Sequence, residues 1–109
     1  MDLSASTPRL RREQVAGMNI HYIMWSLDYF LDAQQRLGFK TIELWAAEPH
    51  VTLDHTGYFE ADELRRKIES RGLSVSSLCP ENVVYPWQYA ARKPLHAQRS
   101  LAYFKHGIE

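Results

Sequence analysis

The pattern of apolar and polar positions predicts a helix between two strands in the first half of the chain. Residues 14–22 mix both kinds of residue and predict a strand, in which Gly17 either weakens the strand pattern or marks a close approach of the backbone. Residues 41–45 form another short, mainly apolar run and predict a second strand. Between the two, an apolar stripe with one polar interruption recurs at the period of a helix and is formed by Leu27, Phe30, Leu31, Gln34 and Leu37.

The ends of this first helix are marked by residues that favour helix termini. Ser26 is placed to cap the N-terminus, and Asp28 lies in the first turn, where the helix dipole favours an anion. Gly38 is placed to end the helix in a left-handed conformation. Only Phe39 and Lys40 then separate the helix from the second strand.

The same order of elements recurs after a polar loop that spans residues 46–60. A second helix is predicted for residues 61–71, where Leu64 and Ile68 would face inward. Gly72 ends this helix in the way that Gly38 ends the first.

A third strand and a third helix complete the pattern. Residues 73–78 predict the strand, and Pro94 suits the first turn of the helix. Further residues follow at helical spacing with no stop signal after them, namely Leu95, Gln98, Leu101, Ala102 and Ile108.

Three alternations of strand and helix predict an α/β fold with a parallel sheet. Such a sheet belongs either to a (β/α)8 TIM barrel or to a small open sheet of the doubly wound kind. No glycine-rich phosphate loop follows the first predicted strand, as a nucleotide-binding open sheet would require. The second strand alternates Ile42 and Leu44 with Glu43 and Trp45, and a charged residue on the inner face near a strand end is typical of barrel enzymes. Because a barrel needs about 250 residues, we predict a partial barrel made of its first three β/α units.

Composition and charge narrow the class of protein. The chain has 109 residues with 13 basic and 13 acidic side chains, so it lacks the basic excess of a nucleic-acid binder. Its single cysteine, Cys79, excludes an intrachain disulfide and, with no adjacent base, is expected to pack as a small apolar residue. No apolar run reaches the roughly 20 residues that span a bilayer. We expect a cytoplasmic protein that contacts neither nucleic acid nor membrane, with a flexible leader (1–12) and one domain (13–109).

Three short runs of the chain resemble motifs of one known enzyme family. The run LGFKTIELW at 37–45, with Pro-His at 49–50, is similar to the second β/α unit of the xylose isomerase-like family of TIM-barrel sugar isomerases and epimerases. The run PENVVYP at 80–86 resembles the loop after the third strand in the fructoselysine 3-epimerase-like branch, where Pro-Glu is followed by Tyr-Pro. Residues 99–101 and 103–104 resemble the third helix of the same group.

The resemblance implies a metal-dependent enzyme that moves a proton or hydride beside the carbonyl of a small sugar or sugar phosphate. A divalent cation, Mn²⁺, Mg²⁺ or Zn²⁺, is implied for the full-length barrel, where strands of the second half supply a Glu, an Asp, a His and a second Glu. Because those strands are missing from this chain, we expect it to bind no cofactor and to be inactive alone. The expected partners are a second copy of the chain or a complementing barrel fragment.

His50 is the candidate catalytic residue. It follows the second strand, where an imidazole could donate to a substrate oxygen or shuttle a proton, although a solvated loop histidine fits the same position. His55 could form a metal pair with it by spacing, but no carboxylate motif accompanies the two. Glu81, just past the third strand, is a candidate substrate contact, or else a carboxylate that orders its loop.

Four further residues are candidates for substrate binding. Glu43 could hydrogen-bond to sugar hydroxyls or be satisfied by backbone amides. Trp45 and Trp25 offer aromatic walls for a sugar ring, although packing is the commoner role of tryptophan. Tyr85, together with Trp87, would close the loop at the entrance of the site.

Two other functions stay open at this stage. The chain could be a non-catalytic interaction or assembly module that associates through an open sheet edge, because a three-strand parallel sheet leaves its last strand unpaired. It could also be a small, complete open-sheet α/β domain that binds a nucleotide or sugar phosphate.

Overall fold

The computed structural model describes residues 9–81 and 86–109, which form a mixed α/β fold. Its main sheet has three parallel strands that lie side by side in chain order: β1 (Gly17–Met18), β2 (Thr41–Ala46) and β5 (Ser74–Pro80). A separate antiparallel hairpin pairs β3 (Leu53–Asp54) with β4 (Gly57–Tyr58). The predicted α/β class and parallel pairing are confirmed, and the strands within the described ranges form no closed barrel.

Three α-helices accompany the sheet: α1 (Leu27–Arg36), α2 (Ala61–Glu69) and α3 (Pro94–Ile108). The starts of α2 at Ala61 and α3 at Pro94 and the cap of α1 at Ser26 are as predicted, whereas α2 ends at Glu69, two residues earlier than predicted. The Ser26 hydroxyl caps α1 by accepting a hydrogen bond from the Tyr29 amide at 3.1 Å. Gly38 and Gly72 follow α1 and α2 with φ of 78° and 67°, the left-handed conformation that glycine adopts without strain.

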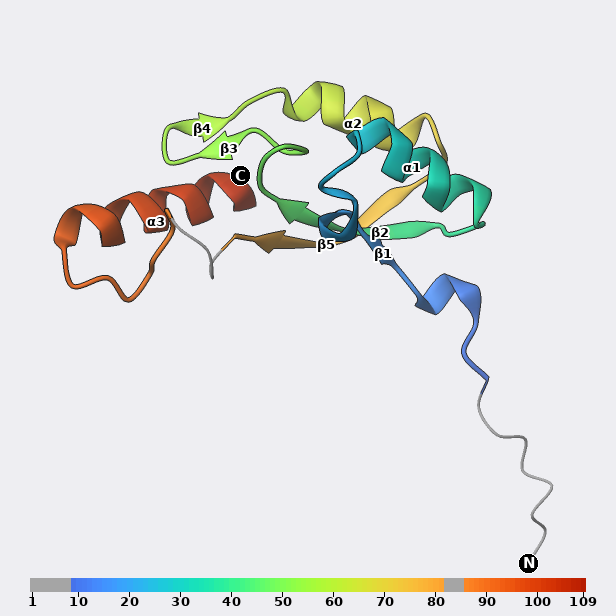
Figure 1. Ribbon diagram of the computed structural model, residues 1–109, viewed down its shortest axis with the longest axis horizontal. Helices are drawn as coiled ribbons and strands as arrows, with labels where there is room; N and C mark the ends of the chain where they lie inside the picture. The colour runs from blue at the N-terminus through green and yellow to red at the C-terminus, as the bar shows by residue number, and fades with distance from the viewer. Residues whose placement is uncertain (1–8, 82–85) are drawn as a thin grey trace, which may run out of the picture.

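Helices α1 and α2 lie next to each other on the same side of the main sheet (Figure 1). Ion pairs join the two helices: Lys67 Nζ lies 3.1 Å from an oxygen of Asp28, and the Arg71 guanidinium lies 2.9 Å from Asp28 and 2.5 Å from Asp32. The hydrogen bond from Lys67 is the main reason why the pKa of Asp28 lies below its ordinary value.

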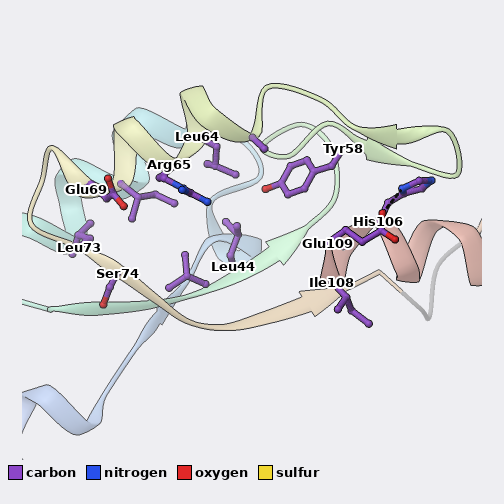
Figure 2. A pocket seen from close by; sticks show the side chains of 14 residues that line it. Leu44, Tyr58, Leu64, Arg65, Glu69, Leu73, Ser74, His106, Ile108 and Glu109 are labelled. Carbon is purple, nitrogen blue, oxygen red and sulfur yellow. Dashed lines mark ion pairs between the residues drawn. The ribbon is translucent and has the colours of Figure 1, made fainter.

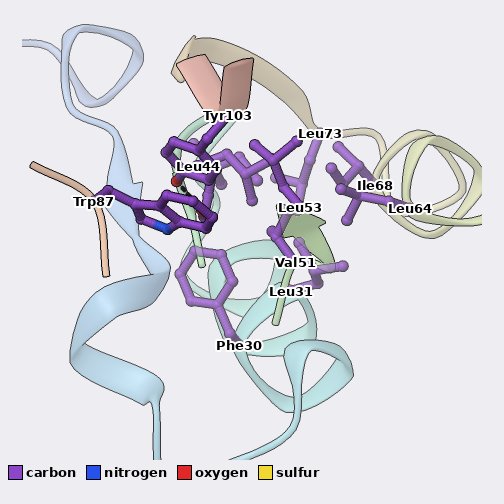
Figure 3. Packing of buried hydrophobic residues seen from close by; sticks show 12 residues of the cluster. Phe30, Leu31, Leu44, Val51, Leu53, Leu64, Ile68, Leu73, Trp87 and Tyr103 are labelled. Carbon is purple, nitrogen blue, oxygen red and sulfur yellow. Dashed lines mark hydrogen bonds between the residues drawn. The ribbon is translucent and has the colours of Figure 1, made fainter. Parts of the chain in front are cut away.

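The hydrophobic core lies between these helices and the sheet, and it continues under the hairpin to α3 (Figure 3). Strand β2 supplies Ile42, Leu44 and Ala46, all buried, whereas Glu43 and Trp45 on its other face are half-buried, as the predicted alternation requires. The cluster is completed by buried side chains of α1, α2, α3 and the loops, namely Phe30, Leu31, Val51, Leu53, Leu64, Ile68, Leu73, Trp87 and Tyr103.

The predicted strand at residues 14–22 is wrong over most of its length. Only Gly17–Met18 pairs with β2, and 3₁₀ turns occupy Arg12–Gln14 and Asn19–Tyr22. Of the two alternatives for Gly17, the structure supports the close approach, since a Cβ added there would clash with Oε1 of Gln34. The Arg12 side chain, at the end of the predicted leader, donates a 2.9 Å hydrogen bond to the carbonyl of Leu37.

The loop predicted at residues 46–60 is more ordered than expected, because it contains the β3–β4 hairpin. Val51 and Leu53 in this segment are buried in the core. At the hairpin turn, Asp54 accepts 2.6 Å hydrogen bonds from the amide and the hydroxyl of Thr56, which lower the pKa of Asp54. Two apolar residues among polar ones therefore anchor this loop.

Strand β5 begins one residue later and ends two residues later than predicted, at Pro80. Its register with β2 shifts at a bulge, because Ile42 pairs with Val75 while Glu43 pairs with Ser77. The hydroxyl of the intervening Ser76 donates a 3.0 Å hydrogen bond to the Ile42 carbonyl.

Helix α3 begins at Pro94 as predicted, but the residues noted there at helical spacing do not form its buried face. Leu95, Leu101 and Ile108 are at least half exposed, whereas Ser100 and Tyr103 are fully buried. The reason is that α3 packs beside the β3–β4 hairpin and contacts only part of β5, instead of lying along the sheet like α1 and α2 (Figure 1). None of the helices in the described ranges is long and apolar enough to cross a membrane.

Candidate functional site

The carboxyl ends of the three parallel strands bring together residues that are far apart in the sequence. Asn19 follows β1, Trp45 lies one residue before the end of β2, and Glu81 follows β5. His50 comes from the loop after β2 and reaches the same place. In parallel α/β folds this edge of the sheet is where ligands bind, because the loops there converge.

Asn19 is the centre of this arrangement. It is completely buried, and its side chain bonds to both backbone groups of Trp45. The Trp45 amide donates to Asn19 Oδ1 at 2.6 Å, and Asn19 Nδ2 donates to the Trp45 carbonyl at 3.1 Å. The Asn19 side chain thus takes over the hydrogen bonding to β2 directly after β1 ends at Met18.

His50 is held by both nitrogens of its ring. Its Nδ1 lies 3.2 Å from Asn19 Nδ2, and its Nε2 lies 2.8 Å from the Trp25 carbonyl oxygen. The ring therefore ties the loop after β2 to the loop that precedes α1. The cavity beside His50 holds only about 50 Å³, which is room for a water molecule and far too small for a sugar.

Glu81 is buried and joins β5 to β2. Its Oε2 accepts a 3.0 Å hydrogen bond from the indole Nε1 of Trp45. Its backbone amide donates to the Tyr103 hydroxyl at 2.7 Å, and that hydroxyl in turn donates to the Ala46 carbonyl. Burial raises the pKa of Tyr103 to about 12, so the hydroxyl stays protonated and can serve both bonds.

Glu43 and Cys79 lie on the sheet face that carries the Trp45 side chain. Trp45 pairs in register with Cys79, and Glu43 lies two residues earlier on β2. Burial raises the pKa of the Cys79 thiol, and the negative charges of Glu43 and Glu81 raise it further. Cys79 therefore stays a neutral thiol at neutral pH, in agreement with the packing role expected for it.

The other candidate residues are placed less centrally. Trp25 is 52% exposed and stacks on Tyr29, with ring centroids 6.1 Å apart, so only its carbonyl takes part in the His50 network. Trp87 does not line an entrance as predicted. It is buried and stacks on Tyr103 at 4.5 Å, because the core extends to α3. Tyr85 lies outside the described residues.

The residues that the structure describes do not form a metal site. Within residues 9–81 and 86–109, no three His, Cys, Asp or Glu side chains gather in a way that could hold an ion. His50 is engaged with Asn19, while the His55 ring lies 5.9 Å from that of Trp87 in the hairpin region. No chemical step is therefore assigned to a metal bound by these residues.

Asn19 and Tyr103 contribute side-chain hydrogen bonds to this arrangement, and the sequence pattern missed both. Asn19 is the one amide side chain after the apolar start of the predicted first strand. A polar amide at that place was a signal that could have pointed to Asn19. Tyr103 stands between small and apolar residues of α3, where nothing distinguishes a hydrogen-bonding tyrosine from a packing one.

A cleft of about 770 Å³ lies apart from this site, between α2, β5 and the end of α3 (Figure 2). It is on the sheet side that carries the helices, and its apolar walls include Leu64, Ile68, Leu73, Val75 and Ile108. None of the candidate residues within the described ranges lines it. The cleft is therefore a gap in the helix layer beyond α2.

Comparison with known proteins gives no further guide to this arrangement. The sequence matches no family model and no curated protein, and the fold matches no solved structure.

Proposed function

We propose that the chain is the first three β/α units of a TIM-barrel sugar isomerase or epimerase of the xylose isomerase-like family, and that it has no activity alone. The observation that supports this best is the placement of α1 and α2 on one face of a parallel sheet whose strands follow chain order. A barrel wall has this arrangement, whereas an open doubly wound sheet carries helices on both faces. The alternative of a small, complete open-sheet domain is therefore less favoured.

The site residues fit a substrate-side role in such an enzyme. His50 is the candidate for donating to, or taking a proton from, a sugar oxygen. Glu81 and Glu43 are candidates for binding hydroxyl groups, and Trp45 and Trp25 for contacting the sugar ring. The Trp45 indole is already oriented by its 3.0 Å bond to Glu81, and fixed orientation of such groups favours catalysis. The implied divalent metal would be bound by residues outside this chain.

A complementation experiment tests this proposal. The chain is mixed with the polypeptide encoded directly downstream of its gene, and ketose epimerisation is followed in the presence of Mn²⁺. We expect no turnover from the chain alone and turnover from the mixture. Turnover by the isolated chain, or a downstream sequence without further β/α units, would contradict the proposal.

Two histidine variants make the complementation test specific to the site. His50→Ala is expected to lower the complemented activity by at least about 100-fold, the usual scale of a lost general acid or base. His96→Ala replaces an exposed histidine of α3 and should leave the activity within about twofold. Equal effects of the two changes would remove His50 from the mechanism.

A non-catalytic assembly module is the second candidate, and the edge of β5 favours it. One edge of β5 pairs with β2, while no described strand pairs with the other, and residues 74–77 are exposed. The apolar cleft beside this edge would accept a helix that follows an added parallel strand. Either a second copy or a complementing barrel fragment could supply both elements.

A further inference from the structure

The direction of every hydrogen bond around Asn19 follows from the backbone groups that it contacts. An amide N–H can only donate, so the atom 2.6 Å from the Trp45 nitrogen must be the side-chain oxygen of Asn19. A carbonyl can only accept, so the atom 3.1 Å from the Trp45 oxygen must be the amide nitrogen. Two independent contacts therefore fix the same orientation of the Asn19 amide.

The orientation of Asn19 determines which nitrogen of His50 carries the proton. Because Asn19 Nδ2 is a donor, His50 Nδ1 at 3.2 Å must accept and is bare. The proton of the neutral ring is then on Nε2, which donates to the Trp25 carbonyl at 2.8 Å. All four contacts agree with this one assignment.

We propose that Asn19 is the positioning residue of the candidate site, which locks His50 in the tautomer that presents an Nε2–H donor. Asn19 suits this role because it is completely buried and anchored on the backbone of β2. The Trp25 carbonyl marks where an acceptor sits in front of Nε2, and its loop is exposed, with Met24 82% accessible. The role in sugar chemistry rests on the proposed function: the cavity beside His50 holds only about 50 Å³, so a sugar oxygen receives the hydrogen bond from Nε2 only after the Trp25 carbonyl moves away.

The tautomer is measured on the intact chain labelled with ¹⁵N-histidine. Long-range ¹H–¹⁵N correlation spectra distinguish a bare from a protonated ring nitrogen, and loss of signals in His50→Gln assigns the ring. Spectra are recorded near pH 8, above the ordinary histidine pKa of about 6.5. We expect a bare Nδ1 on His50, while the exposed His96 shows a mixture of tautomers.

Two variants of Asn19 then show whether Asn19 determines the tautomer of His50 or whether the ring only follows the intrinsic tautomer preference of imidazole. In Asn19→Ala, His50 should show the mixture seen for His96. In Asn19→Asp, the carboxylate can only accept, so a proton should appear on Nδ1. A tautomer mixture in the wild type, or an unchanged bare Nδ1 in both variants, would overturn the proposal. If the variants do not fold, the contrast within the wild-type spectrum decides: a single tautomer at His50 beside a mixture at the exposed His96 supports the lock, and the same mixture at both overturns it.

Failure of the proposed function would be recognised separately. The tautomer is read from the chain alone, whereas the function is read from complemented turnover. A locked tautomer without complementation refutes the sugar enzyme and leaves the positioning role of Asn19 intact.

Discussion

The Gln34 side chain is a buried polar group whose carbonyl oxygen has no hydrogen-bond partner. It is 3% exposed on the inner face of α1, and its oxygen points to the backbone of β1 at Gly17. An unsatisfied buried acceptor costs about 1–3 kcal/mol of stability. The close fit leaves no space for a side chain at position 17 of β1.

Replacing Gln34 by methionine is expected to raise the free energy of unfolding by about 1 kcal/mol, since Met has a similar length and removes the unpaired oxygen. Urea denaturation followed by circular dichroism measures the change. Gln98→Met, at an exposed site on α3, serves as the control and should change stability by less than about 0.5 kcal/mol. A loss of stability in Gln34→Met would mean that the amide makes a contribution that its contacts do not reveal.

Local signals in the sequence predicted the helices of this fold better than its first strand. Ser26, Gly38 and Gly72 act within a single turn, so their effect can be read from neighbouring residues. The extent of β1 depends instead on Asn19, which bonds to Trp45, 26 residues away. The inward face of α3 likewise depends on the hairpin that it meets, which apolar spacing within the helix could not reveal.

The candidate site was predictable in part for the same reason. Strand order placed His50, Trp45 and Glu81 at one edge of the sheet, because loops that follow parallel strands converge there. The partners of these residues could not be predicted. The bond between Trp45 and Glu81 depends on the register of two strands, including the bulge at Ser76.

At the scale of elements, charge pairs hold α1 against α2, and they make this contact sensitive to acid. The pKa of Asp28 is lowered, chiefly by its hydrogen bond with Lys67. A lowered carboxyl pKa contributes stability above the ordinary value of 3.8, and this contribution is lost as pH falls through the lowered value. The side chains of Lys67 and Asp28 are 35% and 45% exposed. Solvent screening therefore keeps the contribution of this ion pair to stability small.

Asp28→Asn is therefore expected to lower the free energy of unfolding by about 0.5–1 kcal/mol near pH 7. The difference from the wild type should shrink as pH falls below 3.8 and through the lowered pKa of Asp28, because the carboxyl then becomes protonated in the folded chain as well as in the unfolded one. Thermal unfolding across this pH range measures it. Glu48→Gln, at an exposed loop carboxylate, should show no such convergence, and a constant gap for Asp28→Asn would contradict the assignment.

At the scale of the whole molecule, the sheet is asymmetric. Its helix side is covered by α1 and α2 over β1 and β2, but the cleft leaves Val75 of β5 44% exposed beside an unpaired edge of the described sheet. An exposed edge next to an apolar surface favours association with another chain.

We expect the purified chain to self-associate through this edge. Val75→Lys should raise the dissociation constant by at least about tenfold, which corresponds to about 1.4 kcal/mol of association free energy. Sedimentation velocity over a range of concentrations measures the change. Val15→Lys replaces a similarly exposed valine, 40% accessible and outside the cleft, and should leave association unchanged. A monomeric wild type at all concentrations would count against the edge as an interface.

The Tyr103 hydroxyl has a consequence for how the site responds to distant change. One oxygen atom bonds the end of β2 at Ala46 and the start of the loop after β5 at Glu81, and it is carried by α3. Any shift of α3 therefore acts on two strand ends at once, and through Glu81 on the Trp45 indole. A partner that repositions α3 would change the spacing between the walls of the site without touching them.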